Sequence, residues 1–111
     1  MIKVYQIRLT NEELDAINRD ESFPKAEAFF GRSFDRTFKA ENFQYYTHVA
    51  NVACNDMEEA FRAMNLWDEG AKVERLGPCS SMSVGDILEL EDGSFHRVAS
   101  WGFTALENVN A

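Results

Sequence analysis

The chain has 111 residues, of which 45% are hydrophobic and 27% are charged, so it suits one folded domain and is too apolar for a disordered protein. Its net charge of −8, from 19 acids and 11 bases, disfavours binding to a nucleic-acid backbone, which needs clustered Lys and Arg. The same charge fits a partner with a basic surface, although acidity also serves simply to keep a protein soluble.

The first third of the chain predicts one strand followed by two helices. Residues 4–9 form a short β-type run. Thr10 and Glu13 have the spacing of a capping box, which predicts a helix that ends near residues 18–19. Pro24 fits the first turn of a second helix, and Gly31 fits its end.

The middle of the chain predicts a long strand and a strongly amphipathic helix. After a loop or helical turn at 31–42, residues 43–54 are rich in aromatic and β-branched side chains, as in a central strand. Asn55 and Glu58 predict the cap of the next helix, which ends between residues 65 and 70. Its apolar stripe has helical spacing and consists of Met57, Ala60, Phe61 and Met64.

The last third predicts short strands joined by turns. We expect strands at 73–76, 84–90 and 95–101, with Asp92-Gly93 as a two-residue hairpin turn. This turn would place Leu90 opposite Phe95. Residues 102–111 then form a short last segment and a polar tail.

This order of elements predicts a single α+β domain over residues 1–111. We expect a mixed, mostly antiparallel sheet of about four or five strands, with about two or three helices packed on one side of it and a C-terminal β-hairpin.

Targeting and redox signals predict a cytoplasmic protein. The chain begins with a strand-like pattern rather than a secretory signal, and no window approaches the ~20 apolar residues of a membrane span. Cys54 and Cys79 do not form a CxxC pair, so we expect reduced thiols. With His48 and His96 they lack the short paired spacings of zinc sites, so we expect no metal and no cofactor.

Enzyme signatures are weak. Cys79 could be a nucleophile with His48 or His96 as its base, but no motif links them. The loop that precedes residue 87 has no GxSxG and the chain has no glycine-rich phosphate motif. We therefore predict no catalytic residue, and we keep four polar side chains as candidates for a ligand-binding loop: Ser80, Ser81, Ser83 and Asp86.

Clustered acids and large aromatic residues are the candidates for binding a partner. Acids could imitate the phosphates of DNA if they shared one face of the molecule. Alternatively, they could merely interact favourably with helix dipoles and keep loops solvated. Aromatic side chains are typical anchors of interfaces, although most serve in cores. The candidates are Glu12, Glu13, Asp15, Tyr45, Tyr46, Asp56, Glu58, Glu59, Trp67 and Trp101.

Four stretches resemble a known group of proteins. They are YTHVANV at 46–52, DMEEAF at 56–61, SMSVGDIL at 81–88 and VASWGF at 98–103. The pattern spans about residues 44–106 and resembles small uncharacterised proteins of phages, plasmids and integrative elements, including those with YodL-like domains. The resemblance implies an accessory role of a mobile element inside a bacterial cell, and it offers no catalytic residues to carry over to this chain.

Three hypotheses for function follow. The first is a non-catalytic acidic protein of a phage or mobile element that binds a host protein with a basic surface, in counter-defence or as a DNA mimic, without binding nucleic acid or membrane. The second is a module that binds a small molecule or nucleotide through the loop at 77–86. The third is an enzyme that depends on Cys79.

Overall fold

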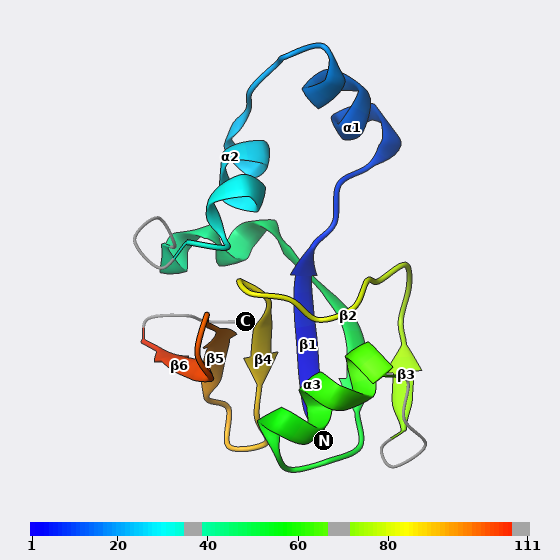
Figure 1. The fold of residues 1–111 in the computed structure, drawn as a ribbon, viewed down its shortest axis with the longest axis vertical. Helices are drawn as coiled ribbons and strands as arrows, with labels where there is room; N and C mark the ends of the chain where they lie inside the picture. The colour runs from blue at the N-terminus through cyan, green and yellow to red at the C-terminus, as the bar shows by residue number, and fades with distance from the viewer. Residues whose placement is uncertain (35–38, 67–71, 108–111) are drawn as a thin grey trace.

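One six-stranded sheet organises the molecule (Figure 1). The computed structural model describes residues 1–34, 39–66 and 72–107. The elements in chain order are β1 (Ile2–Ile7), α1 (Asn11–Asn18), α2 (Pro24–Gly31), the 3₁₀ helix η1 (Ala40–Tyr45), β2 (Tyr46–Val52), α3 (Met57–Leu66), β3 (Val73–Arg75), β4 (Ile87–Glu89), β5 (Phe95–Val98) and β6 (Phe103–Leu106).

The strands lie in the order β3-β2-β1-β4-β5-β6, and every neighbouring pair is antiparallel. The predicted α+β class and C-terminal hairpin are confirmed, while the sheet is larger than expected and, within the described residues, is antiparallel throughout rather than mixed. The extra strand is β6, in the segment that we expected to be a short end. Gly102, at φ +67°, reverses the chain there, and Phe103 pairs with Val98.

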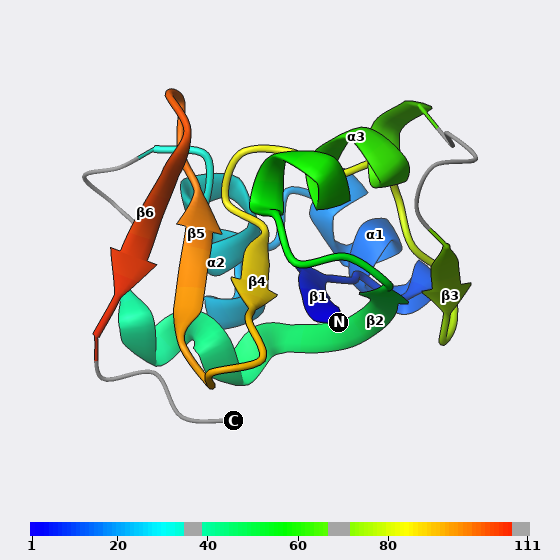
Figure 2. The same ribbon diagram turned by 90° about the horizontal axis from the view of Figure 1, so that it is seen from below.

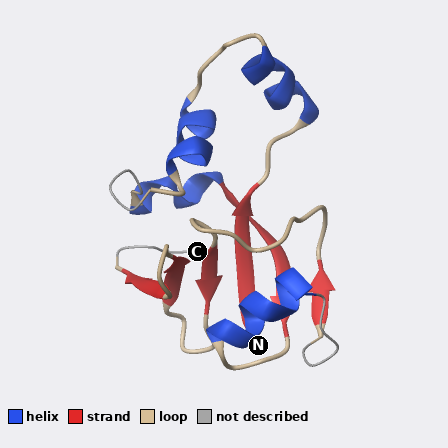
Figure 3. Ribbon diagram, viewed as in Figure 1, coloured by secondary structure: helices blue, strands red, loops and turns tan. Residues whose placement is uncertain are grey.

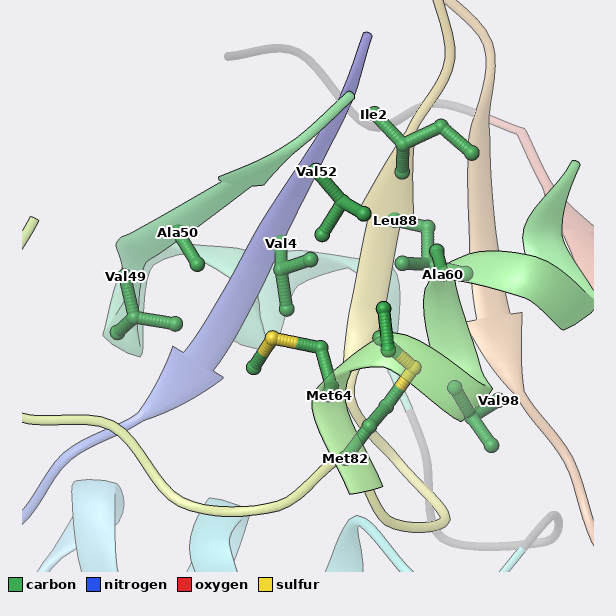
Figure 4. Packing of buried hydrophobic residues seen from close by; sticks show 11 residues of the cluster. Ile2, Val4, Val49, Ala50, Val52, Ala60, Met64, Met82, Leu88 and Val98 are labelled. Atoms are coloured by element: carbon green, nitrogen blue, oxygen red, sulfur yellow. The ribbon is translucent and has the colours of Figure 1, made fainter. Parts of the chain in front are cut away.

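Helix α3 covers one face of the sheet and closes the main core (Figure 4). Its buried residues Ala60 and Met64 pack with side chains from β1, β2 and β4. Met57 and Phe61 are half-buried at the edge of the same cluster. The predicted apolar stripe of this helix is therefore confirmed, because the residues at its spacing all face the sheet.

The opposite face carries a smaller aromatic cluster under η1. Figure 2 shows α3 and η1 on opposite sides of the sheet, so the helices do not lie on one side as expected. The Phe43 ring packs edge-on against Tyr5 and Phe95, with centroids 5.1 and 5.2 Å apart. Residues 43–45 consequently belong to η1, and the strand that we predicted from residue 43 begins only at Tyr46.

The β4–β5 hairpin differs from the prediction by one residue. Ile87 lies opposite Arg97 and Glu89 opposite Phe95, so Leu90 is not the partner of Phe95. The amide of Leu90 donates to Ser94 and that of Gly93 donates to Leu90. The loop therefore has three residues, with Gly93 in the left-handed conformation at φ +85° as its third, and this longer loop shifts every cross-strand pair.

Two helix starts show how local capping works here. The Thr10 hydroxyl accepts from the Glu13 amide, and Glu13 accepts from the Thr10 amide, which confirms the predicted capping box of α1. Helix α3 begins one residue later than expected. Its cap is Asp56 rather than Asn55, because the Asp56 carboxylate accepts from the Glu58 amide at 3.1 Å.

A turn at 83–86 replaces the first half of the strand that we predicted over 84–90. The Asp86 amide donates to Ser83 O, and Gly85 adopts φ +96°. Strand β4 therefore begins only at Ile87, and strand β5 likewise ends at Val98 rather than at 101.

Helices α1 and α2 form an arm at one end of the long axis, away from α3 (Figures 1 and 3). The described part of α1 buries no residue, whereas α2 buries Ala26 and Ala28. A salt bridge of 2.9 Å between Lys25 and Glu13 ties the two helices together. Among the described helices, none has the length and apolar character needed to cross a membrane.

Candidate functional site: a groove beside an exposed tryptophan

The first turns of α3 and the β5–β6 hairpin enclose a groove of about 680 Å³. This volume lies within the range of roughly 300–1,000 Å³ that is typical of binding pockets. The groove is lined by Glu58, Phe61, Arg62, Ser83, Val84, Val98, Ala99, Ser100, Gly102 and Phe103. Its walls are mostly apolar, and its charged groups both come from α3.

Helical and strand periodicity together place these side chains. Glu58, Phe61 and Arg62 are spaced three and four residues apart, so they share one side of α3. Val98 and Phe103 are direct cross-strand partners, so they lie on one face of the hairpin. That face is the one that α3 covers, since both pack against the main core.

Trp101 is 94% exposed and lies in the chain between two residues that line the groove, although it does not line the groove itself. It occupies the tight turn between β5 and β6, in which the Ala99 amide donates to Gly102 O at 3.0 Å. Its chain neighbours Ser100 and Gly102 both line the groove. A side chain of this size normally buries most of its apolar surface, so Trp101 is a candidate for contact with a partner.

Of the four candidates predicted for a ligand-binding loop, one, Ser83, lines the groove. Ser81 is exposed, and the Ser80 amide donates to Gln6 Oε1 at 3.1 Å. Asp86 is only 2% exposed, so its carboxylate is out of reach of a ligand in solution. The structure therefore buries Asp86 beneath the loop, whereas Ser80 is exposed and is held to Gln6 through its backbone.

Gln6 holds this loop in place through hydrogen bonds, and the sequence did not predict this role. Its Nε2 donates to Ser80 O and to Asp86 Oδ2, both at 3.0 Å, and the Ser83 amide donates to the same Asp86 oxygen. Burial raises the pKa of Asp86 to about 6, although these hydrogen bonds and the charges of Arg32 and Arg8 oppose the rise. The only sequence signal was a polar side chain at an inward position of β1.

Tyr46 also belongs to the interior. Its hydroxyl donates to Gly85 O, and burial raises its pKa above the ordinary value. Its ring stacks with Phe43 at a centroid distance of 6.0 Å. Tyr45 instead lines a smaller hollow of about 420 Å³ between α2 and η1, and Trp67 lies outside the described residues.

The predicted acidic candidates fall into two separate groups. Glu12, Glu13 and Asp15 lie on α1, and Asp56, Glu58 and Glu59 lie at the start of α3. Figure 1 places these helices at opposite ends of the long axis, so the two groups do not form one continuous patch. Glu13 is engaged in the capping box and with Lys25, whereas Glu58 is exposed and lines the groove.

The nucleophile and metal candidates are dispersed. Cys54 and Cys79 are free thiols that pack against the main core, and burial raises the pKa of Cys54. His48 Nε2 lies 2.8 Å from Asn51 Oδ1, and His96 Nε2 lies 3.0 Å from Ser94 Oγ. Across residues 1–34, 39–66 and 72–107, no three His, Cys, Asp or Glu side chains gather as a metal site would require.

One arrangement of serine, histidine and aspartate occurs in the β4–β5 turn. Ser94 Oγ donates to Asp92 Oδ1 at 2.5 Å and also contacts His96. The hydroxyl is the central group here, whereas a catalytic triad places the imidazole between the hydroxyl and the acid. The Ser94 amide also donates to Asp92, so this contact is the side-chain turn that supports the hairpin loop.

Comparison with protein-family models finds no match, and searches of curated proteins and of solved structures find none either. The resemblance to YodL-like proteins of phages and mobile elements therefore stays a prediction.

Proposed function

We propose that this protein is a non-catalytic binding module that docks a partner protein in the groove between α3 and the β5–β6 hairpin. The observation that supports this most strongly is Trp101, which is 94% exposed on the turn whose residues Ser100 and Gly102 line an apolar groove. Tryptophan is the residue most enriched among energetic hot spots of protein interfaces, and an apolar groove beside it supplies the surface that a partner would cover.

The charge of the chain supports a basic partner. The net charge is −8, Asp56 caps α3, and Glu58 and Glu59 lie in its first turn, where Glu58 lines the groove. The negative electrostatic potential of these acids speeds the association with a basic surface. From the resemblance of residues 44–106 we further propose that the partner is a protein of a bacterial host cell.

Photo-crosslinking tests this proposal with a matched control. A benzophenone amino acid replaces Trp101 in one variant and Leu76 in another, and both are irradiated in bacterial cells. Leu76 is also an exposed apolar residue, 49% exposed, but it follows β3 at the other edge of the sheet. We expect a discrete crosslinked protein from position 101 and none from position 76. Equal crosslinking from both positions, or none from 101, contradicts the proposal.

A small-molecule ligand is the second candidate, because the groove volume of about 680 Å³ suits one. A thermal-shift screen with nucleotides and metabolites tests it, since a ligand that binds only the folded state raises Tm. Under this alternative a compound raises Tm in the wild type and fails to do so in Phe103→Ala, which enlarges the groove. Flat shifts across the screen contradict it.

A further inference from the structure

We propose that the outer edge of β6 binds an extended segment of the partner and adds it to the sheet as a further strand. This inference rests on the proposed function, since β6 supplies Phe103 to the groove, and it adds the chemistry of the segment that is recognised. Strand β6 lies at one end of the sheet, and no described strand pairs with its outer side (Figure 2).

The outer edge of β6 presents hydrogen-bonding groups of the backbone. The Val98 amide donates to Asp86 O, on the β4 side, so Val98 does not use its amide to bind β6. Its cross-strand partner Phe103 therefore turns its own N–H and C=O groups away from β5, and Ala105, two residues further on, does the same. No described residue outside the hairpin pairs with these groups, so they are available to the backbone of an extended segment.

The composition of β6 leaves this edge unshielded. Proteins commonly protect an exposed sheet edge with charged residues or proline. The opposite edge strand, β3, carries Glu74 and Arg75, whereas β6 has the sequence FTAL, without charge or proline. An edge of this kind suits the addition of a strand, in which hydrogen bonds between main chains provide the affinity.

The side chains of β6 indicate which residues the added segment carries. Half-buried Phe103 packs against the main core on the α3 face, where it lines the groove. Half-buried Leu106 packs against the aromatic cluster on the opposite face. Because side chains of an added strand alternate between the two faces, the segment that fits has apolar or β-branched residues on both, as a strand of valine and threonine does.

Charge decides between a different protein and a second copy of this chain. The edge of β6 could also pair with β6 of another copy. A net charge of −8 on each copy makes two copies repel one another, whereas it attracts a segment that is flanked by Lys or Arg. The occupant is therefore a basic extended segment of another protein.

A defined peptide tests the inference by NMR titration and hydrogen exchange. The probe is a capped peptide of alternating valine and threonine with a lysine at each end. Its control carries N-methyl groups on the central amides, which keeps the side chains but removes the donors. We expect the probe to slow exchange of the Phe103 and Ala105 amides by about five-fold or more, whereas the Thr104 and Leu106 amides, already bonded to β5, change little. The N-methylated peptide should bind at least about five-fold more weakly.

Variants of Ala105 show whether the backbone of β6 carries the binding. Ala105→Pro removes one outward N–H, at the kind of position where an edge strand tolerates proline. Ala105→Val changes the same exposed side chain and keeps the N–H. We expect the affinity for the probe to fall about five-fold in the first variant and to stay within about two-fold in the second. Urea unfolding of both variants checks the sheet, and the N-methylated peptide tests the same bonds on the unaltered protein.

The outcomes separate this inference from the proposed function. Equal binding of the two peptides, or unchanged exchange at residues 103 and 105, overturns strand addition, while a specific crosslink from position 101 still upholds the docking groove. A missing crosslink contradicts the docking groove whatever the peptides do. Sedimentation of the protein alone should show a monomer. A dimer that Ala105→Pro dissociates would mean that β6 pairs with a second copy, and it would overturn the inference as well.

Discussion

Gly85 lies directly against Arg32: a Cβ atom at position 85 would be 2.5 Å from both the Cγ and the carbonyl oxygen of Arg32. The same carbonyl accepts a hydrogen bond of 2.7 Å from Arg97 Nη2. Arg32 is the residue that caps the end of α2. Its contacts with Gly85 and Arg97 therefore join the helical arm to the sheet. No other residue type fits here, because both the space and the φ of +96° require glycine.

Gly85→Ala should therefore destabilise the fold more than the same change at another glycine with positive φ. The matched control is Gly93→Ala, at φ +85° with no atom within 4 Å, which meets only the backbone strain of about 1–2 kcal/mol. We expect Gly85→Ala to cost more than about 3 kcal/mol in urea unfolding, because a clash with backbone atoms adds to that strain. Equal losses in the two variants would show that the Arg32 contact has no energetic weight.

Asp86 should make the protein more stable in mild acid. Its pKa is raised from 3.8 to about 6 by burial, so the folded state binds the proton before the unfolded chain does as the pH falls. This one group then adds about 2 kcal/mol to the free energy of unfolding between pH 7.5 and pH 4.5. Below the ordinary pKa of 3.8 both states are protonated and no further gain follows.

Comparison with Asp86→Asn isolates this effect. Carboxyl groups with lowered pKa, such as Glu13, act in the opposite direction and remain in both proteins. Urea unfolding at the two pH values should show the wild type gaining stability on acidification relative to Asp86→Asn, whose amide does not titrate. Parallel pH profiles of the two proteins would mean that the Asp86 carboxylate is not desolvated in the fold.

Thr10→Ala should loosen α1 without unfolding the sheet. The variant loses the bond of 3.1 Å from the Glu13 amide, which typically costs about 1 kcal/mol. Because α1 buries no residue, we expect this loss to appear as local opening, with roughly five-fold faster hydrogen exchange at the Leu14 amide. Thr10→Ser retains the hydroxyl and should exchange as the wild type does. A drop in the global unfolding midpoint would instead show that α1 supports the core.

The sequence predicted those features of the fold that depend only on residues close together in the chain. The Thr10 capping box, Pro24 at the start of α2 and the helical stripe with Ala60 and Met64 needed only residues within two turns of each other.

Tertiary structure decided everything that depends on residues distant in the chain. A three-residue loop rather than a two-residue one moved each pair of the β4–β5 hairpin, and pairing with β5 turned 103–106 into a strand. Gln6 and Asp86, 80 residues apart, meet only because β1 and the turn before β4 lie side by side. The groove likewise needs α3 and the β5–β6 hairpin together, so it is the packing of separate elements, and no local motif, that leaves Trp101 in solvent beside it.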